Sequence, residues 1–381
     1  MHAIKFGVAL SIVALGAACG SESANGTSDQ DAVSAGGNST AAGTPDDTFG
    51  QAEKSLAAEG CSDAAKDIYV LSNDFELYRF HPGNLSFTRV GQFDCMGPKN
   101  PNFLRAGAQY YFRGMAIDRA GRGWLVMMRW VDSLLAALAQ PWEPAVDQAL
   151  VEFSTTDASC KAGEYEPVLT AAEVGKCMFV AAGPTETLDS ACQRLGARAV
   201  SSIAYASKGN TEQSLYGFQD YGLISIDPIS KQRARIGPLT EQTEDFSTIG
   251  LAGTGDGRLF ELSIRWKKEA SGDYTYTYTL AQRDRATANT IATHAVDFES
   301  IRFHPTAMTF WGGDLWFFGI PADEEGNAKK AVAVVRYNTE TKTLTTVIDS
   351  ISNAVGAPAS DEWKYINGAA NSTCAPLTAP K

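Results

Sequence analysis

The sequence predicts an all-β fold: a β-propeller of five four-stranded blades closed by the C-terminal strand, with a sixth blade in residues 161–200 as the alternative. Five segments of alternating apolar and polar residues each run into a polar turn, and they start at Leu77, Leu150, Leu223, Leu280 and Val334. The starts lie 73, 73, 57 and 54 residues apart. Alternation with a period of two residues is typical of half-buried strands. Its recurrence along the chain indicates a repeat architecture.

Each repeat holds further strand-like segments around this core. A glycine-centred hairpin between two apolar strands precedes several of the repeats, at residues 115–126, 251–260 and 308–317. Four antiparallel strands joined by turns make one propeller blade. A single four-stranded sheet leaves both faces exposed, so blades stack around an axis to bury them. The competing fold is an irregular double β-sandwich.

The first repeat lacks an opening strand. Strands are predicted at residues 68–71, 76–80 and 87–90, and no strand pattern precedes them. Residues 362–370 supply a strand from the other end of the chain, which would complete the first blade and close the ring. A disulfide between Cys61 and Cys374 would then staple this closure, and Cys61–Cys95 is the competing pair.

The N-terminus predicts a secreted protein. In residues 1–18, Lys5 precedes an apolar run over 6–15 that ends in small residues, which is the layout of a signal peptide. The run is shorter than the roughly 20 residues that span a bilayer. The segment resembles the lipobox of bacterial lipoproteins, with Gly16 in place of the usual leucine. Cys19 is therefore the predicted lipidation site and the predicted mature N-terminus.

The segment after Cys19 differs in composition from the rest of the chain. Residues 19–60 are dominated by Ala, Gly, Ser, Thr and Asp, with one aromatic residue, Phe49. Such a segment buries too little apolar surface to offset the entropy of ordering it. We expect a disordered tether over 19–60 and a propeller domain over 61–381.

Removing Cys19 from the seven cysteines leaves an even number for disulfide formation. The six candidates are Cys61, Cys95, Cys160, Cys177, Cys192 and Cys374. Disulfides persist outside the cytosol, so up to three bridges are possible among these residues. Spacing favours one local pair among Cys160, Cys177 and Cys192. Buried free thiols are the alternative, and no C-x-x-C motif indicates a redox or zinc site.

The net charge of the chain indicates which kinds of partner it can bind. Removal of residues 1–18, which hold one lysine and no acid, leaves 31 Lys and Arg against 44 Asp and Glu, a net charge of −13. Binding of nucleic acid needs clustered cations to neutralise phosphates, and no such cluster is evident. We therefore expect no nucleic-acid partner, and attachment to the membrane through the lipid rather than through charge.

Two inserts interrupt the repeat. Residues 131–140 are rich in strong helix formers and stop at Pro141. Residues 170–198 contain two helix-like pieces near Cys177 and Cys192. Long insertions on a regular scaffold often carry binding surfaces. The alternative is that they cover an apolar patch or plug one end of the ring.

The sequence contains few candidates for catalytic chemistry, and no catalytic, cofactor-binding or metal-binding residue is assigned. The mature chain has three histidines without metal-ligand spacing, and His81 and His304, each followed by proline, are predicted in turns. Residues 253–257 resemble a phosphate loop but lack a following Lys-Ser/Thr, so a hairpin turn is expected. No serine lies in a G-x-S-x-G context. No cofactor is expected beyond a covalent lipid at Cys19.

Two repeated features remain. Tyr274, Tyr276 and Tyr278 alternate with threonines, which places three tyrosines on one sheet face. They would stack a sugar or simply form a strand of high β-propensity. Asp118, Asp256 and Asp314 occupy corresponding hairpins. They are candidates for a catalytic channel, although Asp is common in turns on backbone grounds alone.

The chain resembles the β-propeller lipoproteins of unassigned function found in myxobacteria and related predatory or social bacteria. The similar pieces are the lipobox-like residues 15–19, the low-complexity tether, the blade sequence 254–260 and the terminal residues 372–376. The resemblance covers most of 61–376 and is weakest at the inserts 131–148 and 161–198. It implies a bacterial cell-envelope location and a propeller, and it supplies no catalytic residue.

Two functions follow as hypotheses. The first is a lipid-anchored scaffold, in the outer membrane and facing the periplasm or the surface, that binds an unknown protein or glycan through a ring face or the inserts. The second is an envelope enzyme, such as a propeller lactonase, lyase or hydrolase, with carboxylates at the central channel. Three carboxylates gathered on the axis would favour the enzyme, and dispersal around the rim would favour the scaffold.

Overall fold

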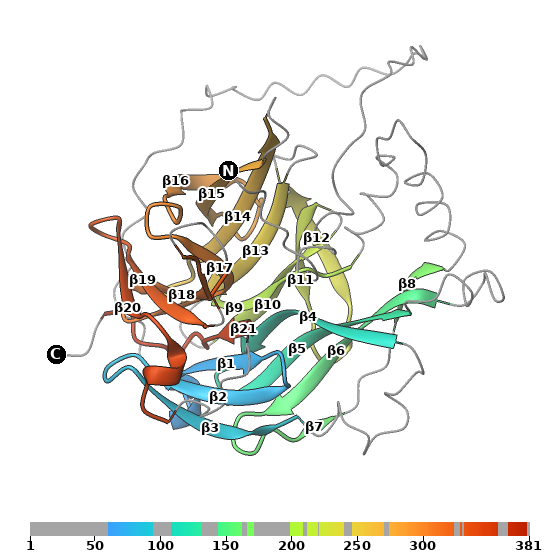
Figure 1. Ribbon diagram of the computed structural model, residues 1–381. Coiled ribbons are helices and arrows are strands. Elements are labelled where there is room, and N and C mark those ends of the chain that lie inside the picture. Colours follow the sequence, from blue (N-terminus) through green and yellow to red (C-terminus); the bar gives the residue numbers. More distant parts are fainter. Residues whose placement is uncertain are drawn as a thin grey trace, which may run out of the picture.

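Five antiparallel sheets form a closed ring in the computed structural model (Figure 1). The structure describes residues 60–93, 108–131, 144–161, 166–170, 199–208, 212–219, 221–239, 246–269, 274–323, 328–329, 331–356 and 365–378. The all-β propeller prediction is confirmed with five blades, so the sixth blade and the double sandwich are wrong. The predictions for residues 1–18 and 19–60 lie outside the described residues.

Each blade is a four-stranded meander that runs from the axis outward. Blade 1 contains β21 (Ile366–Ala370), β1 (Ile68–Ser72), β2 (Glu76–His81) and β3 (Ser86–Gln92). Blade 2 contains β4 (Ala108–Ile117), β5 (Arg122–Val131), β6 (Pro144–Ser154) and β7 (Cys160–Lys161), and β8 (Glu166–Thr170) also pairs with β6. Blade 3 contains β9 (Ile203–Ser207), β10 (Gln213–Gln219), β11 (Gly222–Ile226) and β12 (Arg233–Pro238). Blade 4 contains β13 (Phe246–Gly253), β14 (Leu259–Lys268), β15 (Tyr274–Arg283) and β16 (Thr290–Val296). Blade 5 contains β17 (Phe303–Trp311), β18 (Asp314–Pro321), β19 (Ala333–Asn338) and β20 (Thr343–Ile348).

The two ends of the folded chain meet in blade 1, as the sequence predicts. Strand β21 pairs antiparallel with β1, for example Val70 with Ala369. Its described extent is shorter than the predicted 362–370. The inner strands β21, β4, β9, β13 and β17 contact one another in that order, and β17 returns to β21. The only helical elements in the described part are two short 3-10 turns, η2 (Asp63–Lys66) and η4 (Ile351–Asn353).

One hydrophobic cluster fills each interface between neighbouring blades. The strand β1 shows how, because all five of its residues are buried. Ile68 and Val70 pack toward blade 5, whereas Tyr69 and Leu71 pack toward blade 2. A strand buried on both faces needs apolar residues at odd and even positions alike, which explains why the second strands read as continuous apolar runs.

Turn chemistry accounts for the spacing of the repeat. The turn between the third and fourth strands of each blade contains one residue with positive φ: Leu85 (53°), Ala158 (60°), Lys231 (60°), Ala288 (66°) and Lys342 (59°). These residues lie 73, 73, 57 and 54 positions apart, the same intervals as the strand starts. In three blades the turn opens with Asp227, Asp284 or Asn338, whose side-chain oxygen accepts hydrogen bonds from backbone N–H groups two and three residues on. This is the Asx geometry that Asp and Asn favour.

Glycines allow the inner strands to approach closely around the axis. A Cβ added to Gly253 in β13 would lie 2.0 Å from the carbonyl oxygen of Tyr205 in β9. A Cβ added to Gly114 in β4 would lie 2.7 Å from the backbone nitrogen of Ile203, also in β9. Both neighbours are backbone atoms, which cannot rotate away. The narrow ring of five inner strands therefore depends on missing side chains at these positions.

Gly253→Ala is expected to lower the free energy of unfolding by about 1–3 kcal/mol, the usual cost of overpacking. The added methyl group would push β9 and β13 apart. Urea denaturation measures the change, and Gly83→Ala is the control because no atom lies within 4 Å of its added Cβ. Equal denaturation midpoints for the two variants would contradict this view of the axis.

The structure corrects the boundaries of both inserts. Val131, the predicted start of the first helical insert, ends strand β5, and residues 144–148 belong to β6. Thr170, the predicted start of the second, ends β8, which adds to the outer part of blade 2. β-Sheet pairing with neighbouring strands overrides helix propensity at these ends. The connections 132–143 and 171–198 themselves lie outside the described residues.

Candidate functional site

The three repeated carboxylates lie in equivalent turns but belong to separate ion pairs. Each pairs with an arginine of its own blade: the Nε–Oδ2 distance is 2.7 Å for Arg122–Asp118, 2.9 Å for Arg258–Asp256 and 3.7 Å for Arg336–Asp314. Asp118 is followed by a turn in which the backbone N–H of Arg122 donates to Asp118 Oδ1 at 2.8 Å. These acids therefore stabilise the hairpin of each blade rather than sharing one site.

Their environments differ in detail. The carboxylate of Asp256 is fully buried beside Arg258, which balances its charge. Burial raises the pKa of Asp314 above its usual value, and the nearby guanidinium of Arg336 opposes this shift. Asn338 Nδ2 also donates to Asp314 Oδ1 at 3.0 Å. Among the described residues, no three His, Cys, Asp or Glu side chains gather as metal ligands would.

Residues 371–377, which we call the tail plug, cross the face of the ring that carries these turns. The side-chain oxygen of Asn371 accepts hydrogen bonds from Thr309 Oγ1 (2.7 Å) and the N–H of Phe310 (3.3 Å) in blade 5. Its Nδ2 donates to the carbonyl of Gly253 in blade 4 at 3.1 Å. Thr373 Oγ1 donates to Gln213 Oε1 in blade 3 at 3.2 Å. One buried segment thus ties three blades together.

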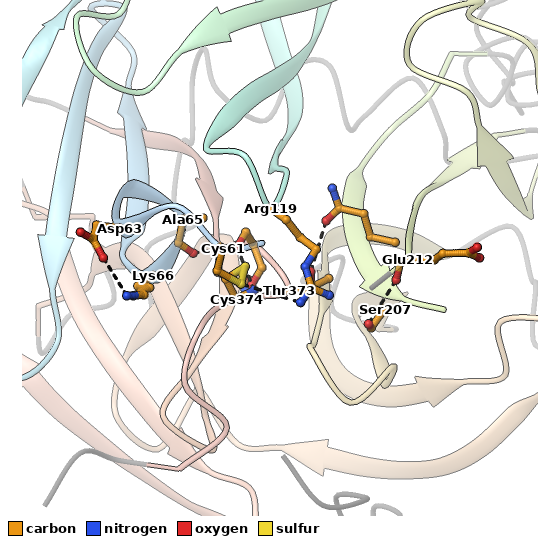
Figure 2. Close-up of a disulfide and its surroundings, with 12 residues drawn as sticks. Cys61, Asp63, Ala65, Lys66, Arg119, Ser207, Glu212, Thr373 and Cys374 are labelled. Carbon is orange, nitrogen blue, oxygen red and sulfur yellow. Dashed lines mark hydrogen bonds and ion pairs between the residues drawn. A yellow bond between two sulfur atoms is a disulfide. The ribbon is translucent and has the colours of Figure 1, made fainter. Parts of the chain in front are cut away.

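The N-terminal end of the domain completes this closure (Figure 2). Cys61 and Cys374 form a disulfide with a Cα–Cα distance of 5.8 Å, which confirms this pairing and excludes Cys61–Cys95. Ser372 Oγ donates to the carbonyl of Ala65 at 2.7 Å. The N–H of Ser62 donates to the carbonyl of Arg119 in blade 2 at 3.0 Å. Residues 61–66 and the tail plug together contact every blade, and we call this side of the ring the closure face.

Cys160 is the only other cysteine among the described residues. Cys160 is disulfide-bonded, in agreement with its prediction as a bridging cysteine. Cys19, Cys95, Cys177 and Cys192 lie outside the described residues, so the lipidation site and the remaining pairings stay predictions. No helix in the described part of the chain has the length and apolar character to cross a membrane.

The glycine-rich residues 253–257 form the hairpin turn between β13 and β14, as predicted. The N–H of Gly257 donates to the carbonyl of Thr254 at 3.2 Å, and Gly257 has a φ of +86°. A positive φ favours glycine because the residue has no Cβ. A Cβ on Gly255 would lie 2.3 Å from the carbonyl oxygen of Thr373, so this turn also seats the tail plug.

Tyr276 and Tyr278 of β15 face the core between blades 4 and 5. Tyr278 is 4% exposed and packs edge-on against Phe298, with ring centroids 5.1 Å apart. Burial raises the pKa of its hydroxyl. Tyr276 packs against the same cluster. The tyrosines share a face as predicted, but that face is a blade interface at Tyr276 and Tyr278, which explains them without a sugar ligand.

The three histidines among the described residues lie in different blades. His81 is the last residue of strand β2 and not a turn residue as predicted, and its Nδ1 lies 3.4 Å from Asp67 Oδ1. His294 lies in β16 near the ring of Tyr337. His304 lies within β17, so its predicted turn is wrong. The following proline is tolerated in this strand because the β17–β18 ladder has a bulge between Pro305 and Ala307.

The burial of His304 leads to a specific prediction for the pH dependence of stability. Burial lowers its pKa below the usual 6.5, against a weaker opposing effect of Glu299. The unfolded chain therefore takes up this proton at a higher pH than the folded chain does. The contribution of neutral His304 to the free energy of unfolding is complete above pH about 6.5. It should be lost progressively as the pH falls through the lower pKa of the folded state. In His304→Gln, thermal unfolding between pH 7 and pH 5 should depend less on pH, and an unchanged dependence would contradict the assignment.

Strand direction separates the connections onto two faces. In an antiparallel meander, the turns after the first and third strands lie on one face, which in this ring is the closure face, and the remaining connections lie on the opposite face. Both ends of the connections 93–107, 132–143 and 171–202 therefore lie at that far face. All three begin or end at a strand of blade 2. The far face beside blade 2 is where the chain departs most from the regular repeat.

Comparisons with known proteins identify no family. No family model and no curated protein matches the chain. Among solved structures, dipeptidyl peptidase 4 of Porphyromonas gingivalis is 7% identical, with a TM-score of 0.27, over 80% of this chain and 42% of that one. A mutant of the Synechocystis apocarotenoid oxygenase is 11% identical, with a TM-score of 0.32, over 74% and 57%. A chain from a nidogen/laminin complex is 9% identical, with a TM-score of 0.32, over 80% and 97%.

The chain spans about half the length of the first two of these structures. With TM-scores between 0.27 and 0.32, the similarities support no statement about function.

Proposed function

We propose that this protein is a lipid-anchored protein of the bacterial cell envelope whose propeller serves as a binding scaffold. The arrangement of the closure face carries the proposal. Asp118, Asp256 and Asp314 each pair with an arginine of their own blade. The tail plug lies on the same face and is hydrogen-bonded to blades 3, 4 and 5. This geometry builds a stapled support rather than a shared catalytic centre, and it disfavours the alternative of an envelope enzyme with carboxylates at the channel.

The position of the domain's N-terminal end supports a division of roles between the faces. Cys61 is bonded to Cys374 on the closure face, so the tether 19–60 joins the ring there. A lipid at Cys19 would hold this face toward the membrane side. The far face, with its long connections at blade 2, would then be presented to a protein or glycan partner. Stable anchoring needs more than one acyl chain, which lipoprotein maturation supplies.

The anchor is tested by metabolic labelling of intact cells with radioactive palmitate. The wild-type protein should be labelled and should sediment with the outer membrane. Cys19→Ser should remove the label and release the protein from the membrane fraction. A Cys19→Ser protein that remains labelled and sediments as before would contradict the lipid anchor.

The scaffold role is tested by cross-linking in intact cells with the full-length protein. Residues 132–143 are replaced by a two-residue Asn-Gly turn, which suits a hairpin between β5 and β6. A cross-linked partner should be recovered with the wild type and lost with this variant. The control is Ile229→Ser on the closure face, where Ile229 is 79% exposed. Equal recovery with all three proteins would contradict a far-face partner.

A further inference from the structure

A crevice opens between blades 2 and 3, and none of the residues that line it takes part in the proposed anchor. Its apolar wall includes Val126 of β5, Val200 and Ile226 of β11. Its free interior volume is about 10 Å³, which is room for one water molecule or one methyl group. The crevice therefore suits the end of a short aliphatic group.

Polar groups lie beside this apolar wall. Gln148, Lys231 and Arg233 also line the crevice. The Gln148 side chain is 3% exposed, and its Oε1 accepts a hydrogen bond from the N–H of Val200 at 2.8 Å. Its amide nitrogen is then the donor group at the wall. Donors from two cations and one amide face the same space, and an oxygen-bearing anion is the ligand that such a set recognises.

The cations belong to one stripe of the outer strand β12. Arg233 and Arg235 pair with Ile226 and Ile224, whose side chains pack toward blade 2. Side chains two apart share a face of a strand, so both arginines lie on the side of the crevice. Lys231 precedes them in the turn. The alternating spacing of 231, 233 and 235 is visible in the sequence and is the signal that points to this site.

Of the three cations in this stripe, only Arg233 forms an ion pair within the described part of the chain. Arg233 Nη2 pairs with Glu166 Oε2 of β8 at 2.5 Å, and both side chains are partly exposed. In the described part of the chain, Lys231 and Arg235 have no ion-pair partner. On the closure face, by contrast, the buried carboxylates of Asp118 and Asp256 each form an ion pair with an arginine. Lys231 and Arg235 lack an acidic partner among the described residues even though the chain as a whole has a net charge of −12 and many acidic residues.

We propose that the crevice between blades 2 and 3 binds a carboxylate carried on a short aliphatic group. The carboxylate would bind between Lys231 and Arg233, with the amide nitrogen of Gln148 as a third donor. The aliphatic group would pack against Val126 and Ile226. Glu166 competes with the ligand for Arg233. This inference goes beyond the proposed scaffold role and does not depend on the lipid anchor.

Binding is measured by ligand-observed NMR titration of the folded protein with sodium acetate, butyrate and hexanoate. Butyrate should bind with a dissociation constant in the millimolar range, while the neutral analogue butanamide should not bind measurably. The dipeptide Ala-Leu and its C-terminal amide form a second pair, which distinguishes a free fatty acid from a peptide C-terminus as the source of the carboxylate. If neither carboxylate binds more tightly than its amide, the proposal is wrong.

Variants test the assigned residues. Arg233→Gln and Lys231→Gln should each weaken butyrate binding roughly tenfold, the loss expected for one charge-assisted hydrogen bond. Glu166→Gln should tighten it, because Arg233 loses its competing carboxylate. The matched control is Arg89→Gln on β3, the outer strand of blade 1, where the arginine side chain is 55% exposed. Wild-type affinity in both Arg233→Gln and Lys231→Gln, or weaker binding in Glu166→Gln, would overturn the proposal.

Discussion

Replacing Cys61 and Cys374 together by serine is expected to lower the free energy of unfolding by about 5 kcal/mol, the largest effect expected of any substitution in this protein. The disulfide joins residues 313 positions apart. Cross-linking so long a loop removes many conformations from the unfolded chain, and the stabilisation grows with the logarithm of loop length. The bond also holds the tail plug, which contacts blades 3, 4 and 5.

Urea denaturation of the oxidised wild type and the double variant measures this effect. Both proteins are then measured again with reductant. The reduced wild type should have the stability of the reduced variant, and any change in the variant on reduction reports the other disulfides, including the one formed by Cys160. If the oxidised wild type and the double variant denature at the same urea concentration, the disulfide does not stabilise the closed ring.

Replacing Glu261 by glutamine is expected to cost about 3–5 kcal/mol, because it leaves a buried guanidinium without its counter-charge. Arg283 Nε donates to Glu261 Oε2 at 2.6 Å, and the two side chains are 1% and 0% exposed. Thr248 Oγ1 donates to Glu261 Oε1 at 3.0 Å. Arg283 also donates to Thr290 Oγ1. These four residues come from β13, β14, β15 and β16, so the network crosses the whole of blade 4.

Two controls separate burial from charge. In the exposed pair Glu152–Lys161 the lysine side chain is 76% exposed, and Glu152→Gln should change stability by less than about 1 kcal/mol. The double variant Glu261→Leu/Arg283→Met should recover much of the loss, because an apolar pair leaves no unpaired charge. The measurement is thermal and urea unfolding of all three proteins. A Glu261→Gln protein as stable as the Glu152→Gln protein would refute the role given to this network.

The strands could be predicted from the sequence because their signals are local. Each blade repeats an alternating strand and a turn in which one residue takes a positive φ, as at Ala158 and Ala288. The closure of blade 1 was also predictable, because a four-stranded sheet that lacks one strand must obtain it from elsewhere in the chain. The pairing of Cys61 with Cys374 follows from the same argument and was confirmed.

The surroundings of the candidate residues were less predictable. The hairpin position of Asp118 was visible, but its ion pair with Arg122 decides that it stabilises a turn. Tyr276 and Tyr278 were predicted to share a face, yet only blade 5 determines that this face is buried. Asn371 gave no local signal, because its partners Gly253 and Thr309 are 118 and 62 residues away in the chain.

The sequence by itself determined the strand pattern, the existence of a repeat and the strand that closes the ring, because these depend on alternation, turn residues and the completeness of each sheet, whereas the structure decided between five and six blades. The tertiary structure alone decided which face carries the tail plug, that three matching acids belong to three separate ion pairs, and that a cationic stripe faces a crevice between blades 2 and 3. These outcomes depend on contacts between blades. A one-dimensional pattern specifies which side of a strand a residue occupies, but not what the neighbouring sheet places against it.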